Sequence, residues 1–129
     1  MLALDFGRAR TGVAVSDPTG TVARPLCVVE LASSGAGLKH LARLVRDEGA
    51  ERVVVGMPLT LKGERGEQAR ETEAFVAALA AVTDVPVDTY DERFTTNLAE
   101  QTSSAAAEDA VAAAHLLTSY LAWSSAARG

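Results

Sequence analysis

The segment LALDFGRARTGVAVSD, residues 2–17, constrains the fold of this chain most strongly. Two short apolar runs flank a turn that contains Gly7, and the first run ends in Asp5. This pattern is typical of a β-hairpin whose strands are buried. A charge at the end of a buried strand is costly unless a cation compensates it, so we expect Asp5 to face a metal ion or an arginine. The alternative interpretation is that Asp5 only caps the turn.

The remaining sequence predicts alternating helices and strands. Short runs rich in Val and Leu predict five strands, at about residues 2–5, 12–16, 22–31, 52–56 and 85–90. Helical spacing of apolar residues predicts one helix before the fourth strand, one after it, and a last helix over about residues 105–123. Strand–helix–strand units pair their strands in parallel, so the pattern predicts an α/β fold, with a five-stranded mixed sheet and helices on both faces.

Length and composition restrict the class of protein. The 129 residues, of which 48% are hydrophobic, fit a single domain over residues 1–129. The sequence has neither a secretory signal nor an apolar run that would span a membrane, and the single Cys27 excludes a disulfide framework. We therefore expect a cytoplasmic protein with a buried Cys27 and no membrane partner. The net charge of −5 argues against broad, nonspecific binding of nucleic acids.

Two adjacent acids end the last predicted strand. Asp91 and Glu92 follow the run PVDTY, much as Asp5 follows the first strand. Neighbouring residues of a strand point to opposite faces, so only one of the two can share a site with Asp5. The alternative role for Glu92 is an ion pair with Arg93.

A third acid lies on the apolar face of the last predicted helix. Asp109, Ala113, Leu116 and Tyr120 follow one another at intervals of four, three and four residues, and only Asp109 is charged. Clustered acids without nearby His or Cys favour Mg²⁺ or Mn²⁺. Two such ions can activate a water and stabilise the leaving oxygen of a phosphodiester. The structural alternative for Asp109 is an interaction with the helix dipole.

The loop GMPLTLKGERGEQAR, residues 56–70, leads from a strand into a helix N-terminus and is a candidate phosphate site. It lacks the P-loop pattern, which excludes that type of nucleotide site, and an ordinary connection is the alternative. Seven loop or turn residues are candidates for contacts with a nucleic-acid backbone: Arg8, Arg10, Lys62, Arg65, Arg93, Thr95 and Thr96. The two threonines would equally serve as caps of the following turn.

Four segments together resemble the YqgF family, also called RuvX, of pre-16S rRNA nucleases once labelled Holliday junction resolvases. They are LALDFGRARTGVAVSD, VVVGMPLTLKGERGEQARETEAF, VDTYDERFTT and EDAVAAAHLLTSYL, which cover nearly the whole chain. The resemblance implies an RNase H-like fold and carries catalytic and metal-binding roles onto Asp5, Glu92 and Asp109. It implies a nuclease that matures the 5′ end of small-subunit ribosomal RNA. The expected cofactor is Mg²⁺ or Mn²⁺, with two ions in our interpretation, and the expected partners are RNA and ribosome-assembly factors.

Three alternatives stay open beside this function. A DNA junction resolvase would use the same fold and acids, because the residues alone do not distinguish RNA from DNA. Many family members carry a longer basic segment before the last helix, whereas this chain has NLAEQTSSAAAE there, which weakens the case for gripping a large branched DNA. Actin-like ATPases also have an Asp-x-Gly loop after a strand, but they need two such domains, and 129 residues provide one. A catalytically silent binding module is disfavoured by the intact acids.

Overall fold

A computed structural model describes residues 1–7, 9–17, 22–57, 66–91 and 105–128, and within the last helix it describes the side chains of residues 110–122. The elements follow one another as β1 (Leu2–Asp5), β2 (Arg10–Ser16), β3 (Ala23–Glu30), α1 (Gly35–Asp47), β4 (Val53–Met57), α2 (Glu67–Val82), β5 (Val87–Asp91) and α3 (Ala105–Arg128). This order confirms the one predicted from the sequence, with boundaries that shift by a few residues.

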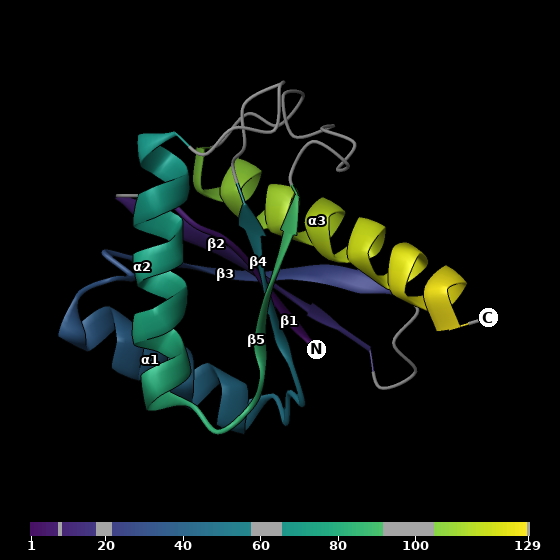
Figure 1. Ribbon diagram of the computed structural model, residues 1–129, viewed down its shortest axis with the longest axis horizontal. Helices are drawn as coiled ribbons and strands as arrows, with labels where there is room; N and C mark the ends of the chain where they lie inside the picture. Colours follow the sequence, from purple (N-terminus) through teal and green to yellow (C-terminus); the bar gives the residue numbers. More distant parts are fainter. Residues whose placement is uncertain (8, 18–21, 58–65, 92–104, 129) are drawn as a thin grey trace.

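The five strands form one mixed sheet in the order β3-β2-β1-β4-β5 (Figure 1). The first three strands pair as an antiparallel meander, in which Asp5 lies opposite Gly12. β4 and β5 join in parallel beside β1, and α1 and α2 are the connections that parallel pairing requires. The predicted mixed sheet is therefore confirmed.

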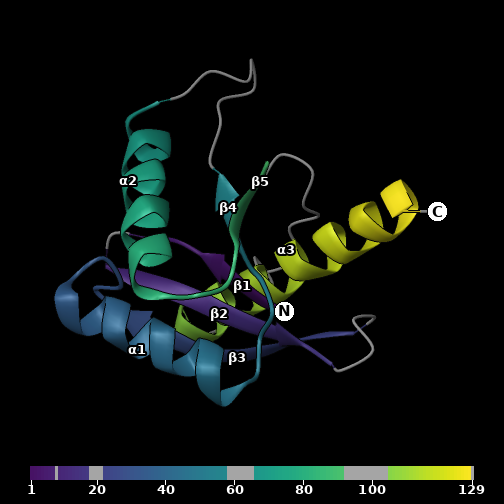
Figure 2. The ribbon, with the colours of Figure 1, turned by 60° about the horizontal axis from the view of Figure 1, so that its bottom comes forward.

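Helices cover both faces of the sheet, as predicted (Figure 2). On one face, Leu41 and Val45 of α1 and Phe75 and Leu79 of α2 pack against the strands. On the other face, α3 packs over Ala3, Ala14 and Val54, among other residues. Alternate residues of each strand thus enter different cores, which is why β1 and β4 are apolar on both sides.

Helix α3 presents the face that the sequence predicted. Ala113 is fully buried, and Leu116 and Tyr120 are almost so. All three belong to the core between α3 and the sheet. None of the helices within the described ranges is long and apolar enough to cross a bilayer.

Helix α1 is held at both ends by specific backbone geometry. Ser34 caps its start, where the Ser34 hydroxyl accepts a hydrogen bond of 3.1 Å from the Gly37 N–H. Gly49 follows the helix with a φ of 62°, a left-handed conformation that favours glycine. Gly37 packs so closely on the preceding loop that an added Cβ would lie 2.3 Å from the Leu31 carbonyl oxygen.

We expect Gly37→Ala to lower the free energy of unfolding by about 1–3 kcal/mol, because the added methyl group forces backbone apart. Gly35→Ala is the matched control: it lies in the same helix turn, and a Cβ there meets nothing within 4 Å. This control should be neutral or stabilising, by up to about 1 kcal/mol. Urea unfolding of the two variants measures the difference, and equal stabilities would contradict the close approach at Gly37.

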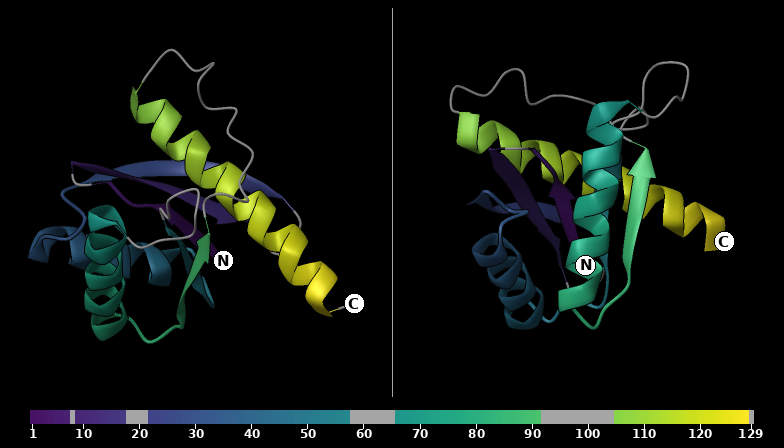
Figure 3. Two further views of the ribbon diagram at one scale, coloured as in Figure 1. Left: turned by 45° about the horizontal axis from the view of Figure 1, so that its top comes forward. Right: turned by 60° about the vertical axis from the view of Figure 1, so that its left-hand side comes forward.

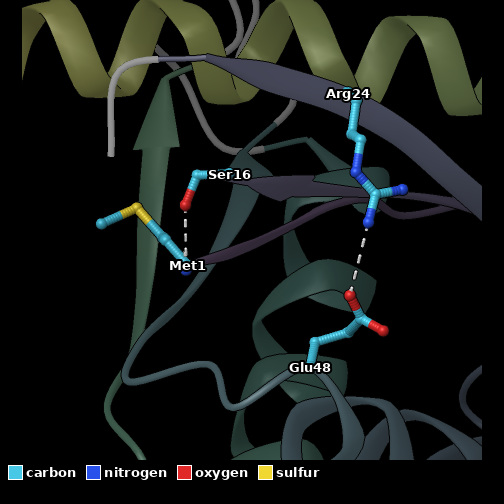
Figure 4. Close-up of polar contacts among 4 residues, drawn as sticks. All are labelled: Met1, Ser16, Arg24 and Glu48. Carbon is cyan, nitrogen blue, oxygen red and sulfur yellow. Dashed lines mark hydrogen bonds and ion pairs between the residues drawn. The ribbon is translucent and has the colours of Figure 1, made fainter. Parts of the chain in front are cut away.

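Two polar contacts tie neighbouring elements together (Figure 4). The amino group of Met1 donates a partly buried hydrogen bond of 3.0 Å to the Ser16 hydroxyl, and Arg24 of β3 lies 3.7 Å from the Glu48 carboxylate after α1. The Arg24–Glu48 ion pair lies at the surface, where such pairs contribute little to stability. Cys27 is only half-buried, which corrects the expectation of a buried thiol; partial burial and the charge of Glu48 raise its pKa.

Candidate active site

The carboxyl ends of β4 and β5 point to one edge of the sheet, toward the side where α3 begins (Figures 1 and 3). β1 runs parallel to β4, so Asp5 ends its strand at this same edge. The register sets Leu4 beside Val55 and Met57 beside Asp91. In open α/β sheets, ligands bind outside the carboxyl ends of the strands, so this edge is the candidate site.

Asp5 lies on the face of the sheet that α3 covers. Ala3 belongs to the core beneath α3, and strand alternation places Asp5 on the same side. Its neighbours on both adjacent strands are buried glycines: Gly12 pairs with it directly, and Gly56 follows Val55, the partner of Leu4. These two glycines therefore bring no side chain next to the half-buried Asp5.

Two features constrain the backbone at Gly7, which follows Asp5 and Phe6. The Gly7 N–H donates a hydrogen bond of 3.4 Å to the hydroxyl of Thr11, which is fully buried. A Cβ at Gly7 would lie 2.5 Å from the Arg10 carbonyl oxygen, so the turn requires glycine there. The hydrogen bond and the close approach of Gly7 to Arg10 both restrain the backbone that leads out of β1.

An aromatic pair fixes the residue next to Asp5. Phe6 stacks on Phe75 of α2, with ring centroids 4.4 Å apart and planes 14° from parallel. Phe75 is 2% exposed and lies in the core under α1 and α2. Phe6 thus points into the core between the sheet and helices α1 and α2, and Asp5 points to the other face of the sheet, which α3 covers.

The two acids at the end of β5 differ in orientation. Tyr90 packs edge-on against Tyr120 of α3, with centroids 5.6 Å apart. Burial, together with the negative charge of Asp91, raises the Tyr90 pKa. Because Tyr90 faces α3, Asp91 points to the opposite face and does not share the side of Asp5. Glu92 lies outside the described residues.

A polar cluster anchors α3 at the other end of the parallel strands. Arg52, just before β4, forms an ion pair with Asp88 of β5, and Tyr120 of α3 lies close enough to add to the raised Arg52 pKa. The Asp88 hydrogen bond is the main cause of the raised Arg52 pKa. Tyr120 follows position 109 by eleven residues, roughly 16 Å along a helix. The anchor therefore fixes the helix that carries Asp109, and the sequence offered no local signal for it.

The other predicted site residues are described only in part. Arg10 is exposed at the start of β2, near the end of β1. Helix α3 includes position 109, but the side chain of Asp109 is not among those described. Several predicted positions lie outside the described residues: Arg8, Lys62, Arg65, Glu92, Arg93, Thr95 and Thr96. Within the described ranges no three metal-binding side chains gather, so the acidic cluster stays a prediction.

Comparison with known sequences gives one consistent set of relatives. A family model described as RuvX, Holliday junction resolvase, matches residues 1–123. A protein of Chloroflexus aggregans is 46% identical over 101 residues, which cover 78% of this chain and 71% of the relative. A protein of Desulforudis audaxviator is 37% identical over 130 residues, which cover 94% and 92% of the two chains. Both relatives bear the name "Putative pre-16S rRNA nuclease".

Solved structures of RuvC from Thermus thermophilus share the architecture. One matches with a TM-score of 0.58 and 18% identity, over 96% of this chain and 97% of that one. Another, in complex with a Holliday junction substrate, matches with a TM-score of 0.57 and 17% identity, over 96% of both chains. At these identities the likeness establishes the fold, and it confirms the RNase H-like prediction.

Proposed function

This chain belongs to the RuvX family, as its sequence motifs predicted, and from that premise we propose that it hydrolyses phosphodiester bonds near the 5′ end of precursor 16S ribosomal RNA. The observation that carries the proposal is the placement of Asp5. Its carboxylate ends a central strand on the α3 side, between two strands that have glycine beside it. The names of the relatives supply the substrate class.

We assign the metal-binding oxygens to Asp5, Glu92 and Asp109. The described part of the site fits a divalent ion, because the Asp5 carboxylate is a hard oxygen donor flanked by glycines on both neighbouring strands. Bound Mg²⁺ or Mn²⁺ ions, two in our proposal, would activate the attacking water and stabilise charge on the phosphate and the leaving oxygen. Asp91 has no such role in the proposal, because it points to the other face.

The chain's own residues would position the substrate. The constrained backbone at Gly7 and the Phe6–Phe75 stack flank Asp5, so little reorganisation of its strand is needed when an RNA strand arrives. The loop cations Arg8, Arg10, Lys62, Arg65 and Arg93, with the hydroxyls of Thr95 and Thr96, would contact backbone phosphates and set the scissile bond against the acids. Such contacts orient a strand without reading its sequence.

Precursor RNA is preferred to a four-way DNA junction in this proposal. The family description and the RuvC complex favour a junction, whereas the relatives' own names favour RNA. Charge supports the choice of RNA: four converging duplex arms need an extensive cationic surface, and this chain carries a net charge of −5. A single strand needs only a few phosphate contacts.

We expect a labelled 5′ fragment of precursor rRNA to be cut at least about tenfold faster than a labelled four-way junction at one salt concentration. Mg²⁺ or Mn²⁺ should support the reaction and Ca²⁺ should not, because the looser coordination of Ca²⁺ misplaces the reacting groups. Excess chelator should stop it. Symmetric nicks in the junction with no RNA cleavage would overturn the RNA assignment, and full activity in chelator would overturn the metal assignment.

A further inference from the structure

Three cations line the outward side of α1. Lys39, Arg43 and Arg46 are all exposed, and their spacing of four and three residues places them on one side of the helix. The opposite side of α1 packs into the core through residues such as Leu41 and Val45. We call Lys39, Arg43 and Arg46 the α1 basic stripe.

The α1 basic stripe has no acidic partner within the described part of the chain. No side-chain ion pair or hydrogen bond joins its three residues to other described residues. By contrast, Arg24 pairs with Glu48 and Arg52 pairs with Asp88. The stripe thus presents three cations without an ion pair among the described residues, on a protein whose net charge is negative.

Helix stability does not explain these cations. Like charges three and four residues apart repel one another and destabilise a helix. Only Arg46 lies in the last turn, where the helix dipole favours a cation; Lys39 lies in the second turn, and the first turn holds no acid that would offset it. An arrangement that the helix itself disfavours points to an anionic ligand.

Helix α1 starts close to the turn that follows Asp5. The Leu31 N–H, just before α1, donates a hydrogen bond of 3.0 Å to the carbonyl of Ala9, in the turn that follows Asp5. From there α1 runs along the face of the sheet opposite α3 (Figure 2). Lys39 and Arg46 are seven residues apart, about 10 Å along the helix axis. The three cations therefore offer up to three phosphate contacts to a strand that follows the helix.

We propose that the α1 basic stripe binds the sugar–phosphate backbone of a single-stranded RNA flank. This flank extends from the sheet edge at which Asp5 ends β1. This inference rests on the proposed function, because it assumes an RNA substrate at that edge. RNA fits the stripe better than an acidic protein does. Protein interfaces usually need large apolar or aromatic anchors, and no large apolar side chain of α1 is exposed.

The test is the salt dependence of RNA binding in a protein that cannot cleave. A fluorescently labelled single-stranded fragment of the precursor is titrated with Asp5→Asn protein at several salt concentrations, and anisotropy gives the Kd. A second protein carries three further substitutions, Lys39→Ala, Arg43→Ala and Arg46→Ala. The slope of log K against log salt should become less steep by about 2, since each phosphate contact on a single strand contributes about 0.7. A conservative set, Lys39→Arg, Arg43→Lys and Arg46→Lys, should keep the slope.

A charge-matched control separates local contacts from net charge. Ala74, Ala77 and Ala81 are exposed on α2, and changing all three to Glu alters the net charge by the same amount as removing the stripe. This control should leave the slope unchanged. An equal loss in both triple variants, or an unchanged slope without the stripe, would overturn the inference. If RNA binds through the stripe but the parent protein with Asp5 does not cleave it, the proposed function fails and the stripe assignment stands.

Discussion

Asp5→Asn lowers the rate of RNA cleavage at least about a hundredfold in our account, because even partners outside the first coordination shell of a metal usually change activity 10–100-fold. Asparagine keeps the shape of the side chain and removes the charge that would hold a divalent ion. The fold should persist, with a melting temperature equal to or above that of the parent, since a carboxylate cluster without metal repels itself. Rates measured at saturating Mg²⁺, with circular dichroism for the fold, test both expectations.

Asp91→Asn is the matched control for this variant. Asp91 also ends a parallel strand at the same edge, but it points to the face opposite Asp5. We therefore expect cleavage by Asp91→Asn at close to the parental rate. Undiminished cleavage by folded Asp5→Asn would remove Asp5 from the mechanism, and equal losses in the two variants would show that the effect does not depend on the face.

Phe75→Ala should have the largest effect on stability. Phe75 is 2% exposed, packs in the core beneath α1 and α2, and stacks on Phe6. Removing such a ring from a core usually lowers the free energy of unfolding by about 3–5 kcal/mol. Loss of the stack also frees Phe6, the neighbour of Asp5, so activity per folded molecule should fall as well.

Phe75→Leu separates these two effects. It retains most of the buried volume and loses the ring stack, so its unfolding free energy should fall by less than that of the alanine variant. Urea unfolding gives the stabilities, and cleavage rates at a temperature where both variants are folded give the effect on the site. A Phe75→Ala protein as stable as the parent would contradict the packing described for this core.

The fold was largely predictable because each element carries its own local pattern. Val-rich strands bounded by Gly, Pro or Asp gave the five strands, and the spacing of Ala113, Leu116 and Tyr120 gave the buried face of α3. The boundaries were less accurate. β2 begins at Arg10, two residues before the predicted start, because Arg10 and Thr11 pair with Glu30 and Val29 of β3. Such pairing depends on a partner strand that the local sequence does not reveal.

The candidate site was predictable only in part, because strand register decides its geometry. The sequence indicated Asp5 as a strand-end acid, but not that Gly12 and Gly56 lie beside it. The residues alone also left Asp91 and Glu92 undecided. The contact of Tyr90 with Tyr120 shows that α3 covers the face opposite Asp91, which supports the choice of Glu92.

Two further features needed the three-dimensional arrangement. Arg52 and Asp88 are 36 residues apart in sequence and meet only because β4 and β5 pair in parallel. The spacing within the α1 basic stripe is visible in the sequence, yet its exposure and its lack of described partners are not. Long-range pairing and solvent exposure are properties of the assembled sheet rather than of any local segment.

A crystal structure of the protein soaked in Mn²⁺ would show whether Asp5 binds the metal ion. The anomalous signal of manganese identifies the ion without reference to activity. We expect Mn²⁺ bound by the Asp5 carboxylate on the α3 side of the sheet, with Glu92 and Asp109 as the other acidic ligands. If the protein cleaves RNA at the same Mn²⁺ concentration but no manganese lies at the Asp5 carboxylate, then Asp5 does not bind the metal ion that supports cleavage.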